Sequence, residues 1–295
     1  MLRYFRTIVI LAMLLPFPFQ CLSQIPDSVY HINFLPPGLH LAPIKANFRE
    51  ARVGLLKFLT VSDLRVDIGN SIDILGYEND AEKIKYTVGI DFLAYALSKR
   101  SEGLRLQIDA LDGLFGGNFS ASKTYDNSRL SARLRLLHQS GHFVDGHYDF
   151  NEGGWFDNKS PVPFTRDFGE LVLAEDLFQT GGIFKYYGGI SYATLVRPAQ
   201  LERFEYFTGM EYSRGDVLPS ILDHPTNIFA AYQFTLAGVL KHVGANELQT
   251  GVKFGEWYGK GPVIYLIFYS GPQFYGEYYD ERIETIGAGF TMDFF

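Results

Sequence analysis

The sequence is poor in cysteine, tryptophan and methionine, with one, two and four copies in 295 residues. The single cysteine, Cys21, excludes a disulfide within the chain. After the first 25 residues, no apolar run approaches the roughly 18 residues that a membrane-spanning helix requires. The apolar residues are spread out instead, so a bundle of membrane-spanning helices is not expected.

Basic residues are also in deficit, because 26 Lys and Arg stand against 33 Asp and Glu, a net charge of −7. A nucleic-acid partner would require a basic face, so none is expected. Aromatic residues, by contrast, are abundant, with 19 Tyr and 26 Phe. Both residue types favour strands, and tyrosine is also enriched where a membrane meets water. The length suits a single all-β domain.

The first 23 residues predict a cleaved secretory signal peptide. A positive start is followed by an unbroken apolar stretch over residues 8–15, which is too short to span a bilayer, and small residues precede a cleavage point after Ser23. Cleavage there removes the only cysteine and two arginines, which changes the net charge from −7 to −9. The alternative, a lipoprotein anchored through Cys21, requires a small residue at the preceding position, which is Gln20.

From residue 51 onward, apolar and polar side chains alternate. Leu64, Val66 and Ile68, for example, are separated by Arg65 and Asp67. A period of two indicates strands with one apolar and one polar face. About twelve segments follow this rule: residues 52–58, 64–74, 84–92, 104–109, 130–142, 168–177, 183–194, 204–212, 228–240, 248–257, 263–269 and 285–294. The sequence therefore predicts an all-β fold, an antiparallel barrel of about 12 strands over residues 51–295.

The alternation alone does not distinguish a soluble barrel from a membrane barrel, in which the polar face lines the lumen and the apolar face meets lipid. Two features favour a transmembrane β-barrel in the outer membrane of a Gram-negative bacterium. The first is the signal peptide. The second is the last strand, which alternates from Ile286 to Phe294 and is followed by Phe295. This ending resembles the assembly signal of outer-membrane barrels. The expected partners are outer-membrane lipid, lipopolysaccharide and, through this strand, the barrel-assembly machinery.

The segment over residues 24–50 contains four prolines and shows no period. It is interpreted as an extended periplasmic lead-in, or as a segment that tucks into the barrel mouth. An even number of strands places both chain ends on the periplasmic side, with short turns there and long loops outside. Residues 143–166 and 270–282 fit as long external loops. Residues 116–127 and 213–226 are long on the wrong side, which suggests a miscounted strand; Gly116 and Gly117 are interpreted as a turn.

Two stretches carry a family resemblance. Residues 132–145 read Ala-Arg-Leu-Arg-Leu-Leu-His-Gln-Ser-Gly-His-Phe-Val-Asp, and residues 269–294 run through Gly-Pro-Gln-Phe-Tyr and then Glu-Arg. Both resemble a family of uncharacterised Gram-negative envelope proteins that is catalogued only as a domain of unknown function. The resemblance extends from about Leu35 to the end and implies an outer-membrane barrel without an established activity. Gly141 departs from the serine usual in the family's histidine motif, and the acidic pair is reduced to Asp145 followed by Gly146.

The histidine stretch also contains candidate catalytic residues. Because Arg133 and Arg135 must face the lumen, the alternation places His138, Ser140 and His142 on the outer wall. These residues lie at the outer end of their strand, near the lipopolysaccharide headgroups. This position resembles that in outer-membrane lipid A deacylases, which carry a His-x-Ser pair on the outer wall of a barrel.

In that interpretation His138 is the general base and Ser140 the nucleophile. A carboxylate should orient the imidazole, and either Asp145 in the following loop or Asp167 on the neighbouring strand could supply it, with Asp145 as the third candidate residue. The asparagine that commonly follows the serine in those enzymes is Gly141 here. The alternative is a polar rim that ends the lipid belt and braces the following loop.

No cofactor or metal is expected. His138 and His142 are four residues apart on a strand, roughly 13 Å at 3.3 Å per residue, too far to hold one ion. The loop over residues 143–166 carries four acidic residues that could bind Ca²⁺. Because these residues lack a recognisable ligand spacing, a solvated loop is the expectation.

Three function classes remain open. The first is a structural or narrow-lumen transport barrel, because about twelve strands enclose a lumen that side chains can partly fill. The second is a lipid-acting serine hydrolase. The third is a surface adhesin or receptor that uses the loops over residues 143–166 and 270–282.

Overall fold

The computed structural model describes residues 30–101 and 105–295, so the signal peptide predicted for residues 1–23 lies outside the described part. The strands are β1 (Tyr30–Phe34), β2 (Val53–Phe58), β3 (Leu64–Asn79), β4 (Ile84–Ser101), β5 (Arg105–Thr124), β6 (Ser128–Phe143), β7 (Tyr148–Asp149), β8 (Gly154–Trp155), β9 (Phe164–Gln179), β10 (Gly182–Arg197), β11 (Phe204–Arg214), β12 (Thr226–Gly238), β13 (His242–Phe254), β14 (Gly261–Pro272) and β15 (Arg282–Asp293). The short 3₁₀ helices are η1 (Asp145–His147), η2 (Phe156–Asn158) and η3 (Gly276–Tyr278). Among these residues, no helix is long and apolar enough to cross a membrane.

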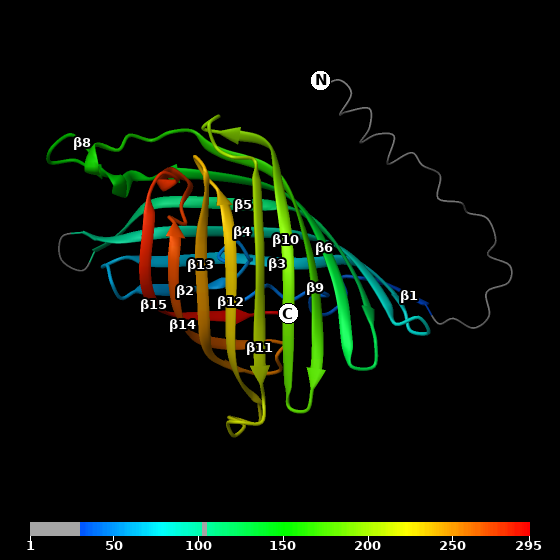
Figure 1. Ribbon diagram of the computed structural model, residues 1–295. Helices are drawn as coiled ribbons and strands as arrows, with labels where there is room; N and C mark the ends of the chain where they lie inside the picture. Colours follow the sequence, from blue (N-terminus) through cyan, green and yellow to red (C-terminus); the bar gives the residue numbers. More distant parts are fainter. Residues whose placement is uncertain (1–29, 102–104) are drawn as a thin grey trace, which may run out of the picture.

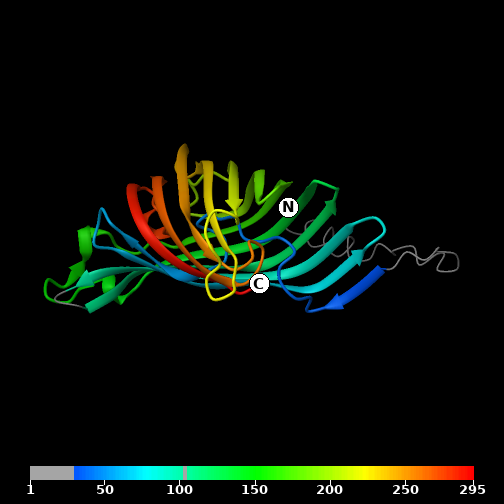
Figure 2. The ribbon, with the colours of Figure 1, turned by 90° about the horizontal axis from the view of Figure 1, so that it is seen from below.

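Twelve of these strands, β2–β6 and β9–β15, form a closed antiparallel barrel (Figure 1). Each strand pairs with its neighbour, and the short strand β2 closes the ring because it pairs with β15 on one edge and with β3 on the other. Seen from below, the strands curve around a common interior, and the loop that carries β7 and β8 projects to one side (Figure 2). The predicted all-β class and strand number are confirmed.

The two faces of the wall separate apolar from charged side chains, as the alternation predicts. All twelve barrel strands carry exposed large apolar side chains, such as Leu134 and Leu136 on β6. The residues between them point inward, and Arg133 and Arg135 are 5% and 1% exposed. A soluble protein has the opposite arrangement, whereas a barrel surrounded by lipid requires this one. The fold is that of a transmembrane β-barrel.

Strand β5 is much longer than predicted, so the expected loop over residues 116–127 is wrong. The strand continues to Thr124, and only residues 125–127 remain as the turn to β6. Glycines at positions 113, 116 and 117 have no side chain and therefore hide the period of two. Strand number was not miscounted, because the other exception, the connection over residues 215–225 between β11 and β12, is a genuinely long loop.

Gly116 lies where β5 and β6 approach closely. A Cβ at Gly116 would lie 1.9 Å from the carbonyl oxygen of Leu136, whereas a Cβ at Gly117 would lie 3.7 Å from its nearest neighbour, the carbonyl oxygen of Gly89. We expect Gly116→Ala to lower the free energy of unfolding by about 1–3 kcal/mol through overpacking, and Gly117→Ala to change it little. Urea unfolding of the refolded variants in lipid vesicles measures both values. Equal losses in the two variants would contradict this account of β5.

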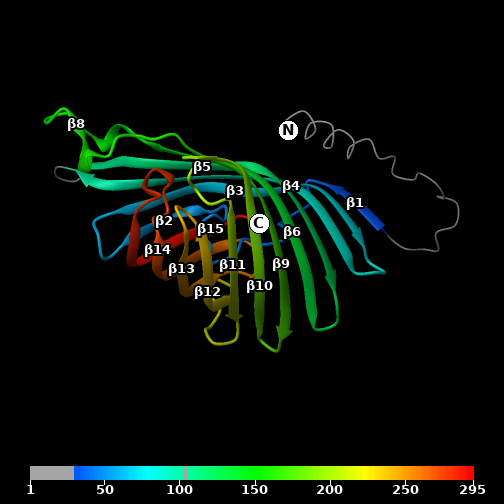
Figure 3. The ribbon, with the colours of Figure 1, turned by 45° about the horizontal axis from the view of Figure 1, so that its top comes forward.

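Residues 40–52, the later part of the segment before β2, lie inside the barrel, the second of the two positions left open by the sequence. Strand β1 first pairs with the last five residues of β3, residues 75–79 (Figure 3). The chain then enters the lumen, where the carboxylate of Glu50 contacts Arg133 and lies 3.5 Å from Arg135. The Lys45 ammonium lies 2.9 Å from Asp293. Burial alone would raise the pKa of Glu50, but the two guanidinium groups outweigh it and hold the pKa below its usual value.

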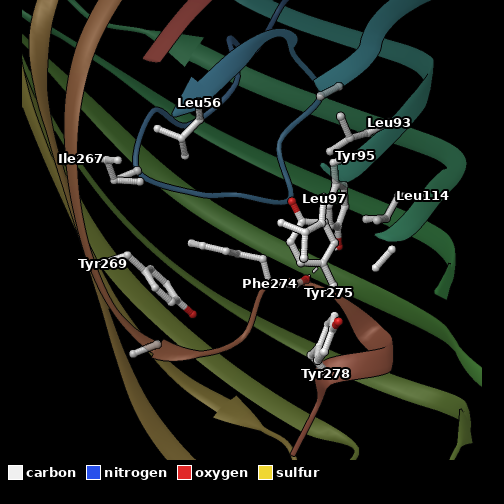
Figure 4. Packing of buried hydrophobic residues seen from close by; sticks show 14 of the residues in the cluster. Leu56, Leu93, Tyr95, Leu97, Leu114, Ile267, Tyr269, Phe274, Tyr275 and Tyr278 are labelled. Carbon is white, nitrogen blue, oxygen red and sulfur yellow. Dashed lines mark hydrogen bonds between the residues drawn. The ribbon is translucent and has the colours of Figure 1, made fainter. Parts of the chain in front are cut away.

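The outer end of the lumen is filled by the loop over residues 273–281, which folds inward (Figure 4). Its side chains Phe274, Tyr275 and Tyr278 are 3%, 1% and 4% exposed. The backbone N–H of Gly276 donates to Asp112 on β5 at 3.0 Å. The external contact surface expected of this loop is therefore reduced, because these three aromatic side chains are buried in the lumen and only residues 280–282 are exposed.

Candidate active site

The candidate residues lie where β6 pairs with β9. In this register His138 faces Asp167 across the two strands, and Ser140 faces Thr165. The predicted orientation is confirmed, because the alternate residue Gln139 is buried in the lumen whereas His138 and Ser140 lie on the outer face.

His138 is held by a carboxylate on the outer wall. Its Nδ1 lies 2.6 Å from Oδ1 of Asp167, and the two side chains are 36% and 46% exposed. The ring also packs against Phe115, with 5.0 Å between ring centroids. A neutral imidazole that donates from Nδ1 leaves Nε2 as the proton acceptor. Within the described residues, neither Nε2 of His138 nor Oγ of Ser140 makes a hydrogen bond, so both atoms can engage a bound molecule.

Asp145 is not the partner of this histidine. It lies in η1, beyond the end of β6, with an exposed side chain and no contact to His138. Strand pairing determines which carboxylate contacts the histidine. Asp167 is directly opposite His138 on β9, whereas Asp145 is seven residues further along the chain. The alternative carboxylate named from the sequence, Asp167, takes its place in the candidate site.

The pair lies at the outer border of the apolar belt. On the same outward face of β9, the next acidic residue is Glu175, whose carboxylate accepts a hydrogen bond from Tyr186. Eight residues separate Glu175 from Asp167, about 26 Å along the strand and about 20 Å along the membrane normal for a strand tilt near 40°. Leu171 and Leu173 lie exposed between them. Because the apolar band of such barrels is about 25 Å tall, the His138–Asp167 pair sits at its outer boundary.

The glycine that departs from both motifs has a packing reason. A Cβ at Gly141 would lie 3.0 Å from the Asp112 carboxylate and 3.1 Å from Cα of Gly276 in the inward loop. The inward fold of residues 273–281 thus occupies the space that a serine or asparagine at position 141 would need. Gly141 faces the lumen, so the outer wall around Ser140 is not altered by this departure.

A second histidine cluster was missed by the sequence analysis. His147 is fully buried, its Nδ1 lies 2.8 Å from Asp109, and its ring stacks on Phe143 at 3.7 Å between centroids. Tyr278 donates to the other oxygen of Asp109 at 2.5 Å. These bonds hold the outer loops over residues 144–163 and 273–281 to the barrel. The alternation of polar and apolar residues placed Asp109 on the lumen-facing side of its strand. No local signal indicated its partners His147 and Tyr278, which lie 38 and 169 residues away in the sequence.

A third histidine, His40, meets a serine at the inner end of the lumen. Its Nε2 lies 2.6 Å from Oγ of Ser122, and its backbone N–H donates to Asp73 at 2.7 Å. Burial, followed by the charges of Lys85 and Arg129, lowers the pKa of His40 to about 3. An imidazole this weakly basic is a poor general base at neutral pH. The contact therefore anchors the N-terminal segment and does not activate Ser122.

Within residues 30–101 and 105–295, no group of three or more His, Cys, Asp or Glu side chains is arranged to hold a metal ion. The acidic residues of the outer loop do not converge. Asp149, for example, caps its own turn by accepting from the backbone N–H groups of Asn151 and Glu152 at 2.8 and 3.2 Å.

No protein-family model matches this sequence, and no curated protein sequence matches it. Several solved structures are similar in shape. The β domain of the Bordetella autotransporter Brka matches with a TM-score of 0.42 at 12% identity, over 82% of this chain and 96% of that one. The Pseudomonas putida toluene transporter TodX gives 0.41 at 10%, over 79% and 71%. LpxR from Salmonella typhimurium gives 0.36 at 10%, over 79% and 88%. Because these scores are all below 0.5, the fold and the site rest on the residues of this chain.

Proposed function

We propose that this chain is an outer-membrane β-barrel that hydrolyses an acyl ester of a lipid at the outer leaflet. The observation that carries the proposal is the hydrogen bond between His138 and Asp167 on the lipid-facing wall. Polar and ionisable groups on that wall cost free energy that apolar residues would not. His138 is oriented by a carboxylate and lies two residues before Ser140 on the same outward face of β6. This arrangement suits nucleophilic catalysis.

The chemistry follows from the free atoms of the site. Ser140 Oγ attacks the ester carbonyl of the lipid while Nε2 of His138 takes the hydroxyl proton. The proton passes to the leaving alkoxide oxygen as the ester bond breaks, which leaves an acyl group on Ser140. A water molecule, deprotonated by the same imidazole, then releases the fatty acid and restores the serine. Asp167 keeps the ring in the required tautomer and stabilises the imidazolium that forms in each step.

The position of the site supports a membrane lipid as the class of substrate. The pair lies at the outer border of the apolar belt, where the ester linkages of a membrane lipid lie between acyl chains and headgroups. The expected signal peptide and the aromatic last strand support the outer membrane of a Gram-negative bacterium, where lipopolysaccharide fills the outer leaflet. The barrel-assembly machinery is the expected partner for insertion through β15.

The interior of the barrel gives less support to the other two functions. The N-terminal segment and the loop over residues 273–281 occupy the lumen from its two ends, so transport would require both to move. The same inward loop leaves only residues 280–282 exposed on one of the two surfaces proposed for adhesion. The loop over residues 144–163 remains outside, and it is held down by the buried His147.

Mass spectrometry of lipid A tests the proposal. Cells that produce the wild-type barrel should lose an acyl chain, and cells that produce Ser140→Ala should retain it. Ser270→Ala is the matched control, because Ser270 is another hydroxyl at the outer end of its strand, on β14. We expect this control to behave like the wild type. Unchanged lipid A in cells whose barrel is shown to be folded would rule out a lipid A substrate and end the proposal for this lipid.

A further inference from the structure

A cavity of about 50 Å³ lies inside the outer half of the barrel, on the lumen side of the wall that carries the candidate active site. Its floor is the N-terminal segment at Phe48 and Arg49, and its roof is the inward loop over residues 273–276. The walls come from β6, β9, β11, β12, β13 and β14. The cavity is therefore built from parts that are far apart in the sequence and that meet only in the folded barrel.

Unsatisfied polar atoms gather around this cavity. Eleven buried side-chain nitrogen or oxygen atoms in the described residues have no hydrogen-bond partner, and five of them belong to residues that line it. They are Nε of Arg49, Oε1 of Gln139, Nε of Arg166, Oε1 of Gln233 and the hydroxyl of Tyr275. Buried polar groups are normally paired, so a concentration of unpaired ones around one space indicates a molecule that would pair them.

Arg166 is the most unusual of these residues. Six lysines and arginines are buried in the described part of the chain, and five have a carboxylate within 4 Å: Arg65, Arg133, Arg135, Lys185 and Lys253. Arg166, at 5% exposure, has none there. The nearby carboxylate of Glu205 accepts from both terminal nitrogens of Arg49. The cavity is thus lined by a buried guanidinium whose nearby carboxylate is already bonded to a second arginine.

The cavity also offers acceptors. The amide nitrogen of Gln139 donates to Tyr95 at 3.1 Å and to Asp112 at 2.9 Å, which leaves its oxygen as a free acceptor. Glu247 on β13 is 4% exposed and accepts a hydrogen bond from the amide nitrogen of Gln249 at 2.8 Å, and no cation of the described residues lies within 4 Å of it. A guanidinium and a carboxylate, each without an opposite charge of the described residues within 4 Å, therefore line the same space, and a bound molecule that carries both charges would supply a partner to each.

We propose that this cavity binds a small zwitterion of the α-amino acid class. The planar guanidinium of Arg166 matches a carboxylate with two parallel hydrogen bonds. The ammonium group finds acceptors in the amide oxygens of Gln139 and Gln233 and in the carboxylate of Glu247. At about 10–15 Å³ of accessible space per water molecule, the cavity holds about three to five water-sized groups, which fits an amino acid with little or no side chain.

Calorimetric titration of the refolded full chain in detergent with glycine tests the proposal. Saturable binding is expected for the wild type, with affinity reduced about tenfold or more in Arg166→Gln, because charge-assisted hydrogen bonds are lost. Arg197→Gln is the matched control, since Arg197 is exposed and outside the cavity, and its affinity should be unchanged. Arg166→Lys keeps the positive charge but loses the planar guanidinium that makes two parallel hydrogen bonds, so this variant should bind glycine more weakly than the wild type.

Acetate and methylammonium separate the zwitterion from simpler ligands, because each carries one half of glycine. Both are expected to bind at least about tenfold more weakly than glycine. Acetate binding as tightly as glycine would overturn the assignment in favour of a plain anion site. No saturable glycine binding by the folded wild type, or equal affinity in Arg166→Gln, would also overturn it. If Arg166→Gln does not refold, the comparison with Arg166→Lys decides, and equal affinity there counts against the proposal.

Discussion

Removing both segments that enter the lumen is expected to turn a closed barrel into one that conducts ions. The variant consists of residues 51–295 with a short Gly-Ser turn in place of residues 274–280. Such a turn can join the strands because the backbone N–H of Gln273 already donates to the carbonyl of Glu281 at 3.0 Å. Both segments are held by buried contacts, Glu50 with Arg133 and Gly276 with Asp112. Without them, charged side chains would line a water-filled lumen.

Planar bilayer recordings measure the change, and the two single removals are the controls. Each of these leaves one end of the lumen filled, so neither should conduct, and the full chain should not conduct either. Retention of the folded form is checked by the gel mobility of unheated samples. Conductance by the full chain would favour the transport function, whereas a folded but silent double variant would mean that wall side chains alone close the lumen.

The sequence predicted the wall of the barrel well because alternation is a local property. All twelve strand segments were located, and the inward positions of residues such as Lys185 and Glu211 follow directly from the period of two. The pattern failed only where side chains are missing, at the glycines of β5, and at strand ends. Both failures shortened strands without changing their number.

The contents of the lumen could not be predicted in the same way. The burial of Phe274 and Tyr278 depends on a loop that turns inward, and Glu50 finds Arg133 at a separation of 83 residues. Prolines in the N-terminal segment excluded regular structure there but did not indicate its location. The partner of His138 was predicted only in part, because both Asp145 and Asp167 were candidates. The register between β6 and β9 selects Asp167, and the sequence does not fix this register because a loop of twenty residues, 144–163, separates the two strands.

Asp167→Asn is expected to lower the rate of lipid hydrolysis by a factor on the order of 10⁴, the size of effect seen when the orienting carboxylate of a serine–histidine–aspartate site is replaced by an amide. An asparagine opposite His138 can donate to Nδ1, which would place the ring proton on Nε2 and leave no base for Ser140. The fold should tolerate the change, because Asp167 is about half exposed on the outer wall.

Asp145→Asn is the control, and it should keep the wild-type rate, since Asp145 does not contact the histidine. Release of fatty acid from mixed micelles of lipid A and detergent measures both rates. A drop in Asp145→Asn alone would return the catalytic acid to the loop, and wild-type rates in both variants would leave the His138–Asp167 bond as a brace for β6 and β9.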